Sequence, residues 1–98
     1  MADIEMTVEI DGKDYTLKMT RDAVRWGEQN GLNIANMERQ PMLQSTILFM
    51  TALRGGGTVV TNAKAQALAD AYFDSCEDFT AVMGELAKMY AEVFHIRG

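Results

Sequence analysis

The sequence has very little of the residue types that export, disulfide chemistry and acid–base catalysis depend on. Its 98 residues include one cysteine, one histidine and one proline. A single cysteine cannot form a disulfide within the chain, so we expect a reducing cytoplasm. The opening stretch, MADIEMTVEI, has no basic segment followed by an apolar run, which argues against a signal peptide. One proline and 23% charged residues argue against a disordered chain.

Positive charge is also scarce. Nine Lys and Arg residues face fourteen Asp and Glu residues, which gives a net charge of −5. A nucleic-acid partner would require a basic patch, and an anionic membrane surface would require one as well, so we expect neither. Apolar residues make up 48% of the chain, enough for the core of one domain spanning residues 1–98.

Catalytic groups are few and isolated. His95 lies near the end of a predicted helix, where a cation near the negative pole of the helix dipole explains it best. Cys76 at a predicted helix start has no basic residue within four positions to activate it. We therefore predict that the protein is not an enzyme and has no catalytic residues.

Ligand-binding motifs are equally weak. The densest acidic group straddles two predicted helix ends and lacks the loop spacing of a calcium site; it comprises Asp70, Asp74, Glu77 and Asp78. Residues 55–58, GGGT, have the glycines of a phosphate loop without its Gly-Lys-Ser/Thr ending. We predict no cofactor and no metal site.

The stretch Pro41–Arg54, PMLQSTILFMTALR, is the one around which the rest of the chain is expected to pack. It has almost no polar face, which is typical of a buried helix. A helix of this length spans about 21 Å, less than the ~30 Å core of a bilayer, so we interpret it as the central helix of a soluble domain. Leu48 and Phe49 should be buried, and Gly55–Gly57 should end the helix.

An alternation of apolar and polar residues from Ile4 to Ile10 predicts a strand, and Asp11-Gly12 is a strong hairpin signal. A second alternation follows through Tyr15–Met19. The predicted hairpin has one apolar face, which must lie on helices or pair with another chain.

Three more helices are predicted. Their expected ranges are Arg21–Asn30 after a Thr20 cap, Ala63–Asp74 after a Thr61 or Asn62 cap, and Cys76–His95 after a Ser75–Asp78 capping box. Asn33–Gln40 is predicted to be a connector. Gly27, in the middle of the first helix, indicates either a close helix contact or a local weakness. The predicted fold is α+β, an N-terminal β-hairpin followed by about four α-helices in a single compact domain.

The last predicted helix has a wide apolar band. Its two stripes are Phe79, Met83, Leu86, Tyr90 and Val93, and beside them Val82, Met89 and Ile96. We expect the core to use one stripe and a partner to use the rest, near the free end. The predicted partner-binding residues are Met83, Met89, Tyr90 and Phe94. Methionine is flexible and polarizable, which suits a variable apolar partner, and the chain has eight methionines.

Several stretches resemble one family. They are residues 10–17, IDGKDYTL, followed by Thr20-Arg21; residues 28–32, EQNGL; Pro41-Met42 leading into Ile47-Leu48-Phe49; and a closing helix with Leu86, Met89 and Tyr90. Together they resemble the small tail assembly chaperones of long-tailed, siphovirus-type phages and prophages. Gly27 departs from the bulky apolar residue expected at that position of the family.

The resemblance implies a non-enzymatic protein that binds the tape measure protein, keeps it soluble and recruits tail tube subunits. It also implies a homo-oligomer in the cytoplasm of the bacterial host that is absent from the mature virion, and in many members a longer frameshifted form. The alternative is a small acidic phage-encoded inhibitor or regulatory protein-binding module. That alternative predicts clustered carboxylates, whereas the acidic residues here are spread along the chain.

Overall fold

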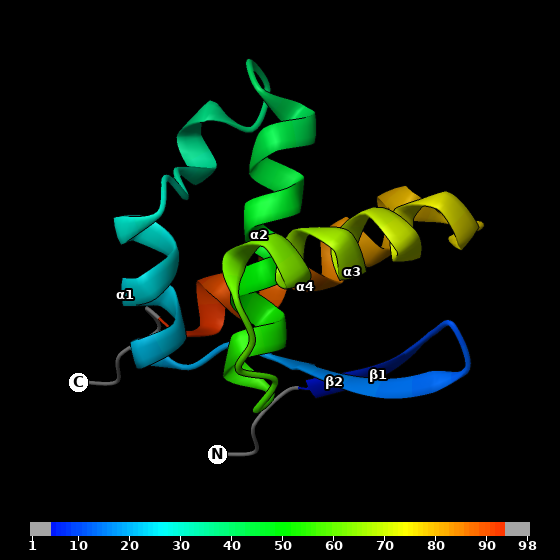
Figure 1. Ribbon diagram of the computed structural model, residues 1–98. Coiled ribbons are helices and arrows are strands. Elements are labelled where there is room, and N and C mark those ends of the chain that lie inside the picture. Colours follow the sequence, from blue (N-terminus) through cyan, green and yellow to red (C-terminus); the bar gives the residue numbers. More distant parts are fainter. Residues whose placement is uncertain (1–4, 94–98) are drawn as a thin grey trace.

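A computed structural model describes residues 5–93 (Figure 1). Over this range the chain forms an antiparallel hairpin followed by four α-helices and one short 3₁₀ turn, which confirms the predicted α+β class. The elements are β1 (Glu5–Ile10), β2 (Lys13–Lys18), α1 (Arg21–Gln29), η1 (Ile34–Asn36), α2 (Pro41–Gly55), α3 (Asn62–Ser75) and α4 (Phe79–Val93). None of the helices within residues 5–93 has the length and apolar character needed to cross a bilayer.

The hairpin has the predicted turn. Asp11 and Gly12 both have positive φ, 51° and 82°, as a two-residue type I′ turn requires. Val8, Ile10 and Leu17 are buried on one face, and that face packs against α2 and α3. Of the two ways to cover the apolar face, the chain therefore uses its own helices (Figure 1).

Helix α2 is the centre of the fold, as predicted. It contacts α1, η1, β2, α3 and α4 (Figure 1). Leu48 and Phe49 are fully buried. The ring of Phe49 stacks on Tyr72 with centroids 5.2 Å apart, and it meets Phe73 edge-on at 5.4 Å. These aromatic contacts hold α3 against α2.

The buried polar groups of α2 are all hydrogen-bonded. The Thr51 hydroxyl donates to the Ile47 carbonyl at 2.8 Å. The Gln44 side chain accepts from the Asn33 amide at 2.7 Å and donates to the Gly31 carbonyl at 3.1 Å. Because these backbone groups belong to the α1–η1 connection, Gln44 fixes that connection against α2.

The glycines after α2 do more than end a helix. The helix continues through Gly55, and only Gly57 is left-handed, with φ 103°. The Thr58 amide then bonds the Leu53 carbonyl at 3.0 Å, which closes a Schellman motif. A Cβ on Gly55 or Gly56 would collide with a backbone carbonyl of β2. The prediction of a simple helix stop was incomplete, because these two glycines also let α2 approach the strand.

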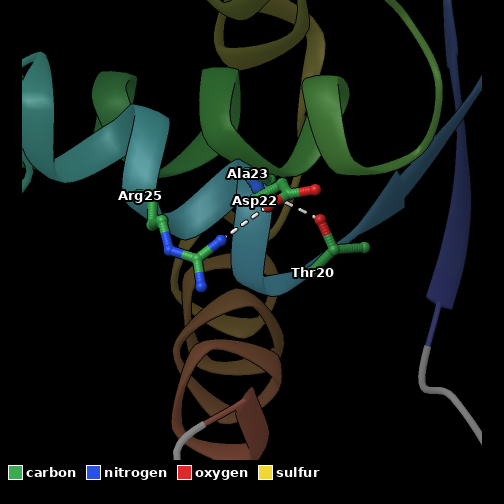
Figure 2. A network of polar contacts seen from close by, with 4 residues as sticks. All are labelled: Thr20, Asp22, Ala23 and Arg25. Atoms are coloured by element: carbon green, nitrogen blue, oxygen red, sulfur yellow. Dashed lines mark hydrogen bonds and ion pairs between the residues drawn. The ribbon is translucent and has the colours of Figure 1, made fainter.

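Helix α1 begins at Arg21 after the predicted Thr20 cap and ends at Gln29, one residue before the predicted end. The Thr20 hydroxyl oxygen accepts from the Ala23 amide at 3.1 Å, and Arg25 pairs with Asp22 at 2.6 Å (Figure 2). At the other end Gly31 is left-handed, with φ 103°, and the following amide, that of Leu32, bonds back into the helix.

The boundary between α3 and α4 differs from the prediction. Helix α3 continues through Ser75, whose hydroxyl donates back to the carbonyls of Ala71 and Tyr72 at 3.3 and 3.2 Å. A serine engaged in this way cannot cap the next helix, so the predicted capping box is wrong. Helix α4 starts at Phe79 and is capped by Asp78, whose carboxylate accepts from the Ala81 amide at 3.1 Å.

Candidate functional site

A groove with a volume of about 560 Å³ lies between α1, α2 and α3. We call its lining the groove residues: Trp26 from α1 and Asn30 at its C-cap, Met42, Leu43, Thr46, Ile47 and Met50 from α2, and Asn62, Gln66 and Asp70 from α3. The volume falls within the range that protein ligand sites occupy.

The groove has a buried apolar floor and an exposed apolar rim. Ile47 and Met50 on the floor are buried. Met42 and Leu43 on the rim are 63% and 51% exposed. The Thr46 hydroxyl donates to the Met42 carbonyl at 2.8 Å, which satisfies that polar group within the helix. Large apolar side chains gathered at the edge of an apolar hollow are typical of a contact surface for another molecule.

The two walls are mostly uncharged. On α1, the centroid of the Trp26 ring lies 5.3 Å from the guanidinium of Arg54, a residue of α2, in a cation–π contact. On α3, three polar residues spaced four apart share one face, namely Asn62, Gln66 and Asp70. Asn62 also donates to the Asn30 side chain at 3.2 Å, which links the two walls. Asp70 is the charged member of the lining, so the groove is chiefly apolar with amide groups at its edge.

The predicted partner-binding residues on α4 lie elsewhere. Met89 is 2% exposed and belongs to the core, while Met83 and Tyr90 are half-buried against the core. Burial raises the pKa of Tyr90, with a smaller contribution from the negative charge of Glu28. Phe94 lies outside the described residues.

The expectation that the core uses only one stripe of α4 is wrong. Leu86 from the first stripe and Met89 from the second are both buried. Partly buried members of each stripe, Met83 and Val82, also pack against the core. The reason is geometric: Leu86 and Met89 are three positions apart, so they are neighbours on the helix surface and the core covers both.

Most of the methionines fill the interior. Among residues 5–93, Met42 is the one methionine with a largely exposed side chain, and the others are buried or packed at the core's edge. Sequence reasoning placed Met42 and Leu43 in the core with the rest of α2. The available signal was their position in the first turn after Pro41, before the buried stretch begins at Gln44.

Tyr72 and Cys76, whose side chains could take part in acid–base or nucleophilic chemistry, do not line the groove. Burial, together with a hydrogen bond to Cys76, raises the pKa of Tyr72 to about 12, so its phenol stays protonated and is unsuited to act as a base. Cys76 follows α3 in an extended conformation and does not lie at the start of α4, where the sequence placed it. Within residues 5–93, no three acidic, cysteine or histidine side chains are grouped to hold a metal ion.

The chain matches a known protein family over nearly its whole length. Residues 1–96 match a protein family described as a domain of unknown function, DUF5055. A search of curated proteins found no match, and a search of solved structures found none either. Because the match covers nearly the whole chain, the protein belongs to the DUF5055 family.

Proposed function

We propose that this protein is a tail assembly chaperone of a long-tailed phage or prophage, which binds the tape measure protein, keeps it soluble and recruits tail tube subunits. The observation that carries the proposal is the pair Met42 and Leu43, exposed at the rim of an apolar groove. The resemblance of the hairpin, of the end of α1 and of the start of α2 to such chaperones supports the same function.

The groove suits such a partner. A tape measure protein is a long helical chain with exposed apolar stripes, and a helix with an apolar face commonly docks in a groove of this kind. Met42 and Met50 can adjust to different side chains along the partner, because methionine is unbranched and flexible. Since the lining contains one charged residue, Asp70, binding should depend little on salt.

The proposal includes an assembly and a location. Several copies of the chaperone coat one tape measure protein, so we propose a homo-oligomer. It acts in the cytoplasm of the bacterial host and leaves before the virion is complete. The net charge of −5 keeps free copies apart and in solution.

Co-expression with the tape measure protein tests this function. The partner is the very long helical reading frame expected beside the chaperone gene. The groove variant Met42→Glu/Leu43→Glu places two charges on the rim. Its matched control, Val59→Glu/Val60→Glu, changes two exposed valines of the α2–α3 loop that do not line the groove.

We expect both variants to keep the wild-type circular dichroism spectrum. The groove variant should lose co-purification and leave the tape measure protein insoluble, and the control should behave as wild type. A groove variant that folds and still keeps the tape measure protein soluble would remove the groove from the proposal. A wild-type protein that never co-purifies with the tape measure protein would overturn the function itself.

A small acidic inhibitor or regulatory module is the second candidate. The outer face of the hairpin favours it, because Glu5, Glu9 and Asp14 are exposed there. Such a module would bind a basic partner through these carboxylates. Its binding would therefore fall steeply with added salt and would be unaffected by the groove variant.

A further inference from the structure

The two outer edges of the hairpin are not equivalent. Ile10 and Lys13 flank the turn and form a hydrogen-bonded pair. Hydrogen-bonded and non-hydrogen-bonded pairs alternate along the antiparallel ladder from that pair, so Thr7–Thr16 is a non-hydrogen-bonded pair. The backbone N–H and C=O groups of Thr7 on β1 and of Thr16 on β2 consequently point away from the hairpin, as do those of the residues two positions away on each strand. Each strand therefore presents one row of polar backbone groups outward.

The row on β2 is covered by α2. A Cβ on Gly55 would collide with the Lys18 carbonyl oxygen, and a Cβ on Gly56 would collide with the Thr16 carbonyl oxygen. The end of α2 thus lies directly on the outer edge of β2. Another strand cannot pair along this edge without displacing α2.

Among the described residues, none covers the row on β1 with a backbone hydrogen bond. Glu5, Thr7 and Glu9 are all exposed. Within residues 5–93, no backbone hydrogen bond joins these three residues to anything outside the hairpin. Free strand edges of this kind accept extended segments of other chains.

We propose that the outer edge of β1 binds an extended segment of another protein that carries Lys or Arg at alternate positions. The charges on this edge specify the partner, because Glu5 and Glu9 flank Thr7 on the exposed face. Glu9 also lies directly opposite Asp14 within the hairpin, and like charges in that arrangement repel each other. A cationic residue opposite Glu9 on an added strand would offset that repulsion.

The same charges argue against a second copy of this chain as the occupant. The antiparallel register that pairs all three outward residues is centred on Thr7, and it places Glu5 of each copy opposite Glu9 of the other. Two glutamate pairs then face each other, which destabilises the pairing. This edge therefore favours a basic segment over self-association.

A peptide titration tests the proposal without altering the protein. The probe is a seven-residue capped peptide that alternates lysine with valine. We expect saturating peptide to slow amide hydrogen exchange at Thr7 and Glu9 by about tenfold or more, because these amides become hydrogen-bonded. The amide of Val8, already bonded to β2, should change little.

Two control peptides separate strand pairing from simple charge attraction. A peptide with glutamate in place of lysine should not bind. A peptide N-methylated on the amides that would face β1 keeps its charge and loses its donors, so it should not protect Thr7. Equal binding of the N-methylated and unmodified peptides, or protection confined to the groove residues, would overturn the proposal.

One variant tests the charge argument independently of any peptide. In the Thr7-centred register, position 5 of each copy faces Glu9 of the other copy. Glu5→Lys therefore replaces two repulsive glutamate pairs with two lysine–glutamate pairs, and two copies of the edge become complementary. We expect the variant to form a concentration-dependent dimer with protected Thr7 amides. The control Lys18→Glu changes the residue opposite Glu5 in the hairpin, and it should form no dimer.

A Glu5→Lys protein that folds and forms no dimer through β1 would show that the edge is not available. The groove variant should not affect either result, so this proposal and the proposed function fail separately.

Discussion

The backbone of Gly27 in α1 lies against the Thr51 side chain in α2, at a separation that leaves no room for a Cβ atom. The Thr51 hydroxyl is held in place by its hydrogen bond to the Ile47 carbonyl, and it would lose that bond by turning away. Gly27 therefore sets how closely α1 packs on α2. The adjacent Trp26 lines the groove, so the same contact also positions one groove wall.

Gly27→Ala overpacks the contact with Thr51, which costs about 1–3 kcal/mol, and alanine regains roughly 1 kcal/mol over glycine in a helix, so we expect a net destabilisation of up to about 2 kcal/mol. Gly84→Ala is the matched control, since a Cβ there meets no atom within 4 Å. It should stabilise the protein by about 0.5–1 kcal/mol. Urea denaturation of both variants measures the difference.

A second change tests whether Thr51 is the cause. Gly27→Ala combined with Thr51→Ala removes the colliding side chain, so the double variant should be less destabilised than the sum of the two single variants. Simple additivity would show that Gly27 and Thr51 do not interact. An increase in stability for Gly27→Ala alone would contradict the close helix contact.

Phe49→Ala should cost roughly 3–5 kcal/mol in free energy of unfolding, because it removes a fully buried ring at the centre of the fold. Phe79 is the matched comparison for the loss of a ring. Its centroid lies 5.1 Å from that of Phe73 in an edge-on contact, but its side chain is 36% exposed. Phe79→Ala should cost clearly less. A loss below about 1 kcal/mol for Phe49→Ala would place α2 at the surface and contradict the fold.

Sequence reasoning identified the elements whose signals are local. The hairpin was predictable because Asp11-Gly12 can adopt the two positive φ angles that a type I′ turn requires. Helix α2 was predictable because an almost unbroken apolar surface has to be covered on all sides. The caps at Thr20 and Thr61 follow from hydrogen bonds between residues three positions apart.

The remaining features depend on distant parts of the chain. Apolar character alone does not distinguish the buried Met89 from the exposed Met42, because which helix covers each of them is a tertiary property. The second role of Gly55 and Gly56 requires β2 to lie beside them. The groove likewise needs three helices that are separated in sequence, so no single stretch predicts it.

The raised pKa of Tyr72 predicts a loss of stability at alkaline pH. Its value is about 12 in the folded protein against an ordinary 10.0, so folding favours the protonated phenol. The resulting stabilisation is complete below pH 10 and is lost as the pH rises toward 12. Tyr72→Phe cannot ionise, so its free energy of unfolding should fall less steeply over that interval than that of the wild type. Identical slopes in urea titrations across the interval would contradict the assignment.

Met89 and Met83 lie on neighbouring stripes of α4 and should respond differently to the same change. Met89→Gln introduces an amide into the core without an evident partner, and it should destabilise the protein by about 1–3 kcal/mol. Met83→Gln alters a half-buried side chain, whose amide can reach water, and it should cost less than about 1 kcal/mol. Thermal denaturation of the two variants side by side measures this contrast.

The contrast also decides how α4 can be tested as a binding surface. Loss of tape measure binding in a Met89 variant would be uninformative, because the core is damaged as well. Met83→Gln keeps the fold and therefore isolates any contact made by α4. If Met83→Gln lowers co-purification of the tape measure protein while the groove variant does not, the partner binds α4; the groove predicts the opposite pattern. Equal stability of the two methionine variants would instead show that Met89 is not part of the core.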